Sequence, residues 1–442
     1  MLIRDLQRQF PEINWLKYIG GIVNMPNIKI TEEEVVIVRV PDYFINLMNL
    51  IKRTPKRVLA NYILAKTVLF IIPYLHQDMR NKEDNYNKVL QGVLDRKSRW
   101  KECVNIATTS INLPISSLYV KNYFKNESKA RAEDLVYTVK REFIKLLEKV
   151  SWLDNITRKH ALEKAAAIAT YIGYPIELLD DYNINKYYSN IQINFDSYLS
   201  AALSINLFND NLEFEKLHGS FNRSDWSKHS LATEINAYYS LEENSISFPA
   251  GILQGTFFDI NRPNYMNYGT LGYVIGHEIT HGFDDEGRQF DKEGNLNEWW
   301  STKTRDTFKE KAECIIRQYD NYIYKEFNQS LNGVNTQGEN IADNAGMKVS
   351  YLAYQSWVKE NGIEPKLPGL DYSPNQMFWI SAAQLWCSKY RKEEMLNAIL
   401  SDDHAPPKFR IIGSLSNSEY FLKDFKCGAN STMNSETKCG VW

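Results

Sequence analysis

The stretch His277-Glu278-Ile279-Thr280-His281 decides how the rest of this chain is interpreted. On an α-helix the two histidines, four residues apart, project from one face about one turn from each other. Two imidazole nitrogens on that face can reach one metal ion, and Zn²⁺ prefers such ligands. Glu278 lies on the same helix, where it can act on a water molecule instead of on the metal. The motif therefore predicts a zinc-dependent peptidase.

The residues on both sides of the motif favour a buried metal site over the alternative, a helix with two satisfied histidines and a solvated glutamate. Residues 271–276 are largely apolar and predict a buried helix, in which histidines need polar partners. Gly282 follows directly and is of a residue type that ends helices. An acidic cluster comes next, Asp284-Asp285-Glu286. Carboxylates there could orient a ligating imidazole through its other ring nitrogen.

A third protein ligand is expected within residues 338–346. If this stretch is helical, Glu339 and Asp343 are four residues apart and share one face. Glu339 would then bind zinc, and Asp343 would accept a hydrogen bond from a ligating histidine. The alternative is an exposed helix with scattered acids, but the apolar Ile341 and Ala342 between the two carboxylates favour burial.

Taken together, these motifs resemble the neprilysin and endothelin-converting-enzyme family of zinc metallopeptidases, peptidase family M13. The resemblance covers essentially the whole chain and is most specific over residues 236–442. It implies a fold that is mainly α with a small β-sheet, in which a thermolysin-like zincin catalytic domain is combined with a helical lid domain. The further segments that are similar to family motifs are residues 236–239, 248–254, 299–300 and 438–442.

Carried over residue by residue, the resemblance implies how the metal is held. Glu278 matches the general base of the reaction. Asp343 matches the carboxylate that supports one ligating histidine, and Asp284 is implied to support the other in the same way. The residues that match the protein ligands of one zinc ion per chain are His277, His281 and Glu339.

The resemblance also implies contacts to the substrate. His404 matches the histidine that stabilises the transition-state oxyanion, although by itself it would be interpreted as a surface-loop histidine. Asp402 matches the carboxylate that holds this histidine. Arg410 matches the arginine that grips substrate carbonyls, and Asn236 and Ala237 match contacts to the substrate backbone.

A hydrophobic pocket just after the scissile bond is implied as well. The matching residues are large or apolar, so we expect the enzyme to prefer a large hydrophobic residue at that substrate position. For the two phenylalanines, core packing is the alternative interpretation. The residues that match the pocket lining are Phe257, Phe258, Val274, Leu385 and Trp386.

The length of 442 residues suffices for two or more domains. Residues 1–200 predict mostly helix, with Thr157 as the N-cap of one of them. We expect this part to form a helical lid-type domain that is N-terminally incomplete, and residues 201–442 to form the zinc-peptidase catalytic domain. An Asn- and Asp-rich stretch around 200–230 predicts a linker. Residues 233–248 predict a β-hairpin, whose edge strand could pair with a peptide.

The composition limits the partners of the chain. Its net charge is −2, from 52 Lys+Arg and 54 Asp+Glu, which makes nucleic acid an unexpected partner. The N-terminus has no apolar core of signal-peptide length. The longest apolar run, residues 68–75, is too short to span a membrane. We therefore expect peptide substrates as partners and no membrane span within this chain.

The cysteines indicate where the protein acts. There are five, and an odd number cannot fully pair within one chain. The resemblance implies that Cys314 pairs with Cys439, and that Cys103, Cys387 and Cys427 match cysteines whose partners lie in an N-terminal section of the family. We therefore expect this sequence to lack the N-terminal anchor and the first part of an ectodomain. The full-length protein would be extracellular or at the cell surface, as a secreted or type II membrane protein.

Three functional hypotheses remain open at this point. The leading one is a zinc metalloendopeptidase that acts on short peptides with Glu278 as general base. The second is a truncated, non-catalytic zinc-binding homologue that serves as a binding or scaffold protein. The third, a structural metal protein, is the weakest, because structural zinc usually has four protein ligands.

Overall fold

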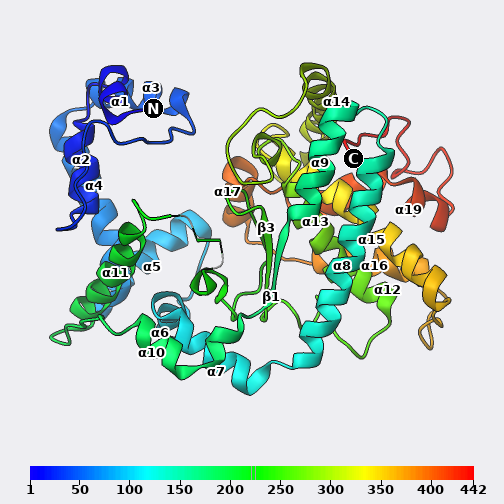
Figure 1. Ribbon diagram of the computed structural model, residues 1–442, viewed down its shortest axis with the longest axis horizontal. Helices are drawn as coiled ribbons and strands as arrows, with labels where there is room; N and C mark the ends of the chain where they lie inside the picture. The colour runs from blue at the N-terminus through cyan, green and yellow to red at the C-terminus, as the bar shows by residue number, and fades with distance from the viewer. Residues whose placement is uncertain (221, 224) are drawn as a thin grey trace. The chain divides into compact units, whose positions relative to one another are not determined.

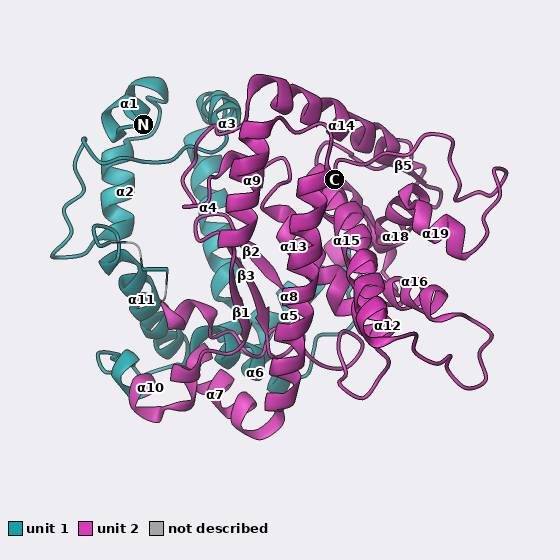
Figure 2. Cartoon of the chain, turned by 45° about the vertical axis from the view of Figure 1, so that its right-hand side comes forward, with its two compact units in different colours: residues 1–89, 93–111, 185–223 teal, residues 90–92, 112–184, 224–442 magenta. Residues whose placement is uncertain are grey.

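The computed structural model describes residues 1–220, 222–223 and 225–442. It is mainly helical with little β-sheet, as the sequence predicts (Figure 1). The strands form one three-stranded and one two-stranded sheet. Two compact units are present (Figure 2). Unit 1 comprises residues 1–89, 93–111 and 185–223, and unit 2 comprises residues 90–92, 112–184 and 224–442. The domain boundary that we expect near residue 200 stays a prediction.

Unit 1 is a helical unit with a small apolar core around Leu6, Phe10 and Trp15. The last of its helices occupies much of the stretch in which the sequence predicts a linker, so that prediction is wrong for residues 198–215. The asparagines of this segment lie on a helix whose N-cap is Ser197. The helices are α1 (Ile3–Gln9), α2 (Trp15–Val23), α3 (Pro41–Arg53), α4 (Lys56–Ile71), α5 (Gln77–Gln91), α6 (Arg99–Ser110) and α11 (Tyr198–Glu215).

One helix of unit 1 has the length and composition of a membrane span. It runs from Lys56 to Tyr74, that is, α4 with the short 3-10 turn η1 (Ile72–Tyr74), and has a mean hydropathy of 1.3. The sequence predicts no span because the uninterrupted apolar run is short, whereas the helix also includes isolated polar residues. A single helix of this kind is weak evidence for a span.

Unit 2 contains the predicted site and the larger core. Its helices are α7 (Asn112–Tyr123), α8 (Asn126–Lys149), α9 (Asn155–Ala167), α10 (Asp181–Tyr187), α12 (Asn264–Asn267), α13 (Tyr273–His281), α14 (Thr302–Asp320), α15 (Gln337–Asn361), α16 (Pro374–Leu385), α17 (Lys392–Ser401), α18 (Pro407–Asn417) and α19 (Glu419–Asp424). Short 3-10 turns occur at η2 (Ile176–Leu179), η3 (Trp226–His229) and η5 (Gly287–Gln289), and a π-helical turn, Tyr268–Gly272, leads directly into α13.

The three-stranded sheet has the order β1–β3–β2. The strands are β1 (Ala169–Gly173), β2 (Tyr238–Ser240) and β3 (Ser245–Pro249), with β1 parallel and β2 antiparallel to β3. The predicted hairpin is therefore present, but its first strand begins at residue 238 and not at 233. The preceding residues turn back and bond to the chain beyond β3, where Gly251 N donates to Ala232 O at 2.8 Å. The smaller sheet pairs β4 (Ile323–Tyr324) with β5 (Gln329–Ser330).

Helices α8, α13 and α15 pack against one another around the core (Figure 2). The contact between α13 and α15 is unusually close because glycines face each other. A Cβ atom on Gly276 would lie 2.8 Å from Gly346 Cα, and a Cβ on Gly346 would lie 2.5 Å from His277 N. Any larger residue at either position would push the two helices apart, and with them the predicted metal ligands that they carry.

A disulfide fixes the C-terminus of unit 2. Cys314 on α14 is bonded to Cys439, which confirms the predicted pairing, and the two cysteines are 125 residues apart in the chain. Next to it, Trp442 packs against Trp152 with ring centroids 5.0 Å apart. The remaining cysteines are not disulfide-bonded within the described residues; they are Cys103, Cys387 and Cys427.

The N-terminus of α9 differs from the prediction. Its N-cap is Asp154, not Thr157, and the helix starts three residues earlier than the sequence suggests. Asp154 accepts hydrogen bonds from the backbone N–H groups of Ile156 and Thr157 and from the Thr157 hydroxyl. It also accepts from the hydroxyls of Ser301 and Thr304 at the start of α14. One carboxylate thus caps α9 and joins it to α14.

We expect Asp154→Ala to lower the free energy of unfolding by about 2 kcal/mol at pH 7, because a cap and several charge-assisted hydrogen bonds are lost. Burial opposes ionisation of Asp154, but the hydrogen bonds outweigh it and hold its pKa well below the usual range. Its contribution is therefore complete above the pKa of the unfolded chain, near 4, and is lost as the pH falls.

Urea denaturation at pH 7 and pH 3 measures this contribution. The difference in the free energy of unfolding between wild type and Asp154→Ala should be smaller at pH 3 than at pH 7. An equal difference at both pH values would contradict the role of the ionised Asp154 carboxylate. Asp181→Ala is the matched control, because Asp181 is exposed and its ion pair with Lys121 lies on the surface. Its effect should stay within about 0.5 kcal/mol.

Candidate active site

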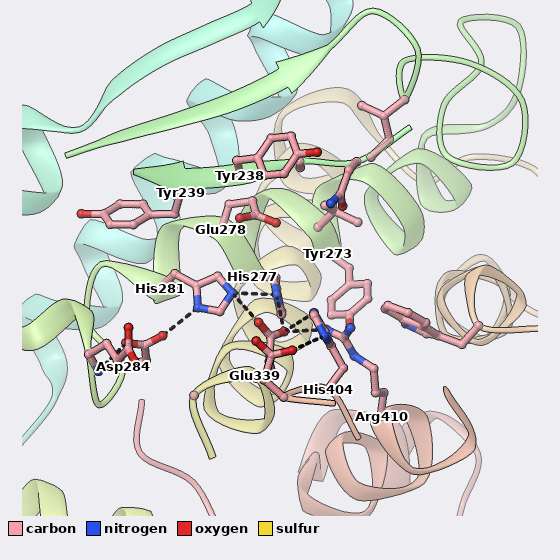
Figure 3. A pocket seen from close by; sticks show the side chains of 18 of the residues that line it. Tyr238, Tyr239, Tyr273, His277, Glu278, His281, Asp284, Glu339, His404 and Arg410 are labelled. Atoms are coloured by element: carbon pink, nitrogen blue, oxygen red, sulfur yellow. Dashed lines mark hydrogen bonds and ion pairs between the residues drawn. The ribbon is translucent and has the colours of Figure 1, made fainter. Parts of the chain in front are cut away.

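Two neighbouring helices supply the centre of the site. Helix α13 carries His277, Glu278 and His281, and α15 carries Glu339 (Figure 3). Asp343 lies on α15 as well, one turn after Glu339. His277, Glu278, His281 and Glu339 line a cavity of about 640 Å³ in unit 2. The helical spacing predicted from the sequence is present in both helices, so the residues that we expect to share a face do so.

Three side chains converge on one point. His277 Nε2 lies 2.9 Å from His281 Nε2. The carboxylate oxygens of Glu339 lie 3.2 Å from His277 Nε2 and 3.4 Å from His281 Nε2. In a tetrahedral zinc site with metal–ligand bonds of about 2.0–2.2 Å, neighbouring ligand atoms are about 3.3 Å apart. The three residues therefore fit zinc in number, type and spacing.

The outer nitrogens of both histidines face carboxylates. His281 Nδ1 lies 2.7 Å from Asp284 Oδ2, and His277 Nδ1 lies 2.9 Å from Asp343 Oδ1. A neutral imidazole that donates from Nδ1 has an unprotonated Nε2. Two such nitrogens at van der Waals distance or closer repel each other unless a cation lies between them. When the histidines are neutral, the carboxylates next to Nδ1 therefore leave Nε2 of each ring free to bind a metal.

Asp343 is the most heavily bonded of these carboxylates and is fully buried. Arg410 on α18 donates to it from Nε at 2.7 Å and from Nη2 at 2.6 Å, and the Tyr273 hydroxyl also donates to it. The Arg410 guanidinium lies over the ring of Trp386, 4.0 Å from its centroid. In this structure Arg410 is therefore held by Asp343 at the wall of the cavity, and its predicted grip on substrate carbonyls stays a prediction.

The electrostatics of the cavity favour a positive charge between the histidines. Burial lowers the pKa of His277, but the carboxylates of Glu339 and Asp343 outweigh this and raise it to about 10. Burial works against ionisation of Glu339, but His277 and His281 hold its pKa well below the usual range. Burial raises the pKa of Glu278, while the two histidines oppose the rise. Glu278 is thus the carboxylate of α13 whose environment increases its affinity for a proton.

His404 lies in the loop before α18, at the edge of the same cavity. Its Nε2 is 3.3 Å from Glu339 Oε2. Its Nδ1 is 3.0 Å from Asp402 Oδ1, as expected, and 2.8 Å from Asp403 Oδ1, a partner that the sequence argument did not include. The side chain is 45% exposed, so it can rotate and can meet a substrate.

The predicted substrate contacts are brought together only in part. Phe258 is buried in the core, and Leu385 is half-buried and packs against the core. Their predicted place in the substrate pocket stays a prediction. The predicted residues that line the cavity are Asn236, Ala237, Phe257, Val274 and Trp386.

The sequence does not single out Tyr273, which also lines the cavity. Tyr273 is buried and bonds to Asp343, and its position one turn before His277 could have placed it on the same face. Asp285, a member of the acidic cluster that the sequence predicts near the histidines, also lines the cavity next to Asp284. Gly338 lies close to it, because a Cβ atom there would be 2.7 Å from Asp285 Oδ1.

Comparison with known proteins gives consistent results. Two sequence profiles described as peptidase family M13 match residues 1–175 and 236–441. Neprilysin-2 of Drosophila melanogaster is 45% identical over 99% of this chain, and human neprilysin is 39% identical over 100% of it. The chain spans 58% and 60% of the lengths of these two relatives.

A solved structure shares the fold. The zinc metalloprotease Zmp1 of Mycobacterium tuberculosis, determined in complex with an inhibitor, superimposes with a TM-score of 0.84 at 28% identity. The match covers 99% of this chain and 65% of Zmp1. The predicted fold class is thereby confirmed. From the profile matches, the relatives and this shared fold, we conclude that the chain belongs to peptidase family M13.

Proposed function

We propose that this chain acts as a zinc-dependent metalloendopeptidase that cleaves short peptides before a large hydrophobic residue. One observation carries the proposal: ligand atoms of His277, His281 and Glu339 lie within 4.8 Å of one another, and Glu278 lines the same cavity. A buried carboxylate with a raised pKa beside three metal ligands is the arrangement that hydrolytic zinc enzymes use.

Each residue has a definable task in such a reaction. A zinc ion held by these ligands would make a water molecule more acidic and polarise the scissile carbonyl. Glu278 accepts a proton from the attacking water and delivers it to the leaving amine. His404 Nε2 donates a hydrogen bond to the oxyanion, while Asp402 and Asp403 hold its Nδ1. No covalent bond between enzyme and substrate forms in this scheme.

The substrate would bind along β2. This strand is at the edge of the sheet, since β3 is its sheet neighbour, and the exposed Asn236 precedes it at the cavity wall. An extended peptide can pair with such an edge through main-chain hydrogen bonds. Phe257, Val274 and Trp386 supply apolar surface in the same cavity. This surface supports a preference for a large hydrophobic side chain.

We propose peptides as the physiological partners, and an extracellular or cell-surface location. The Cys314–Cys439 disulfide supports that location, because structural disulfides persist in oxidising compartments.

Hydrolysis of an internally quenched peptide with phenylalanine after the cleavage site tests the proposed activity. We expect cleavage by the zinc-loaded chain, loss of cleavage with a zinc chelator, and a decrease of about 10²- to 10⁴-fold in Glu278→Gln, because the proton acceptor is lost. Glu310→Gln, an exposed change on α14, is the control and should cleave normally. Near-normal rates in Glu278→Gln would exclude it as the base. Zinc binding without any cleavage would support the scaffold hypothesis.

We expect Glu339→Gln to lose zinc more readily than wild type, because an anionic ligand is replaced by a neutral amide. The measurement is zinc content after dialysis against a weak chelator, determined by atomic absorption. Wild type and Glu310→Gln should retain about one zinc ion per chain. Equal zinc retention in Glu339→Gln would contradict its assignment as a ligand.

A further inference from the structure

Lys164 on α9 is a buried lysine that lies outside the residues considered so far. Its side chain is 1% exposed, between the buried Ala161 and Ala165 of the same helix face. Its Nζ donates to three backbone carbonyls, Gly282 O at 2.7 Å, Gly287 O at 2.7 Å and Phe290 O at 2.6 Å. All three belong to the loop that follows the second zinc-ligand histidine.

Three acceptors at this distance require three N–H donors, which a lysine has only as the charged ammonium. Burial lowers the pKa of Lys164 to about 7, and the carboxylates of Asp284 and Asp291 oppose this shift. A buried charge is costly unless it is fully hydrogen-bonded. The three carbonyls satisfy this requirement, so the ammonium and the loop define each other's positions.

The same loop holds the carboxylate that supports His281. Asp284 Oδ2 lies 2.7 Å from His281 Nδ1, and Asp284 Oδ1 accepts from Gly287 N at 2.7 Å. The carbonyl of that same Gly287 accepts from Lys164. The turn is so tight that a Cβ atom on Gly287 would lie 1.7 Å from His281 O. A continuous series of hydrogen bonds therefore runs from Lys164 through Gly287 and Asp284 to a zinc-ligand histidine.

We infer that Lys164 is a positioning residue of the metal site: by holding the carbonyls of loop 282–290 it fixes the Asp284 carboxylate, and through it the orientation of His281. This inference rests on the proposed zinc site. Lys164 Nζ bonds to the carbonyls of Gly282, Gly287 and Phe290 and not to the proposed ligands, so its effect is on how firmly the ligand set is arranged. Its loss should thus weaken zinc binding more than it changes the affinity for substrate.

Lys164→Met tests the inference, since methionine has a similar length and no N–H donor. The full chain is used, and zinc affinity is measured by competition with a chromophoric chelator. We expect zinc to bind about 10- to 100-fold more weakly, the range typical when a residue that supports a ligand is removed. We also expect an altered visible spectrum of the Co²⁺-substituted protein and a decrease in kcat at nearly unchanged KM.

Lys140→Met is the matched control. Lys140 also donates to backbone carbonyls, Ala166 O at 3.1 Å and Ile168 O at 2.7 Å, but those lie at the end of α9 and not in loop 282–290. The substitution therefore removes a lysine–carbonyl contact of the same kind without a link to Asp284. Zinc affinity should be unchanged in Lys140→Met. An equal loss of zinc affinity in both variants would show a general packing effect and would overturn the inference.

A double-mutant cycle with Asp284→Asn separates positioning from simple destabilisation. If Lys164 acts through Asp284, Lys164→Met should reduce zinc affinity much less in the Asp284→Asn background than in wild type. Fully additive losses would overturn the inference. If Lys164→Met does not fold, as judged by circular dichroism, Lys164→Gln, which keeps two donors, replaces it in the same cycle.

The zinc-affinity test of Lys164 does not depend on peptide cleavage. A wild-type chain that binds zinc but cleaves no peptide would refute the proposed function, while the zinc affinities would still test the inference. Wild-type zinc affinity in folded Lys164→Met or Lys164→Gln would refute the inference and leave the proposed function unaffected.

Discussion

The contact between α13 and α15 is the constraint on which the site depends. Backbone meets backbone at Gly276 and Gly346, and a side chain on either glycine would overlap the facing helix. This approach brings Glu339 within hydrogen-bonding distance of His277, although the two residues are far apart in the sequence. The axes of packed helices are about 8–10 Å apart, and this distance depends on the size of the side chains between them. With larger side chains at this contact, a third ligand on α15 would not reach the histidines without a rearrangement of both helices.

Burying so much charge around one point imposes a second requirement. Asp343 is fully buried and Glu339 largely so, and each is stabilised by cations, with Arg410 shared between them. Removing one member of such a group leaves a buried charge without compensation. The carboxylates of Glu339, Asp343 and Asp284 all lie beside the two histidines. The fold therefore favours a cation between the two histidines, whether or not a substrate is bound.

The sequence predicts the helical spacing of the candidate site residues more accurately than the bounds of the elements around them. The spacing of His277 and His281, and of Glu339 and Asp343, predicts shared helix faces because helical periodicity is local. The predicted N-cap of α9 is wrong because Asp154 is held at that position by hydrogen bonds from Ser301 and Thr304. These two partners are distant in the sequence, so the sequence does not indicate them. The long helix α11 replaced a predicted linker for a similar reason, since composition is a weak guide to helical structure. The role of Lys164 also cannot be predicted from the sequence, because its partners are carbonyls more than a hundred residues away in the chain.

The Cys314–Cys439 bond has a consequence for how the chain comes apart. It closes a loop over a separation of 125 residues, and that loop includes Glu339 but neither His277 nor His281. A metal ion shared by these three residues would close a second loop, and each loop would contain one end of the other. Resistance to unfolding would then depend on both redox state and metal supply, because the disulfide restricts the unfolded chain and a metal ion would bind the folded chain.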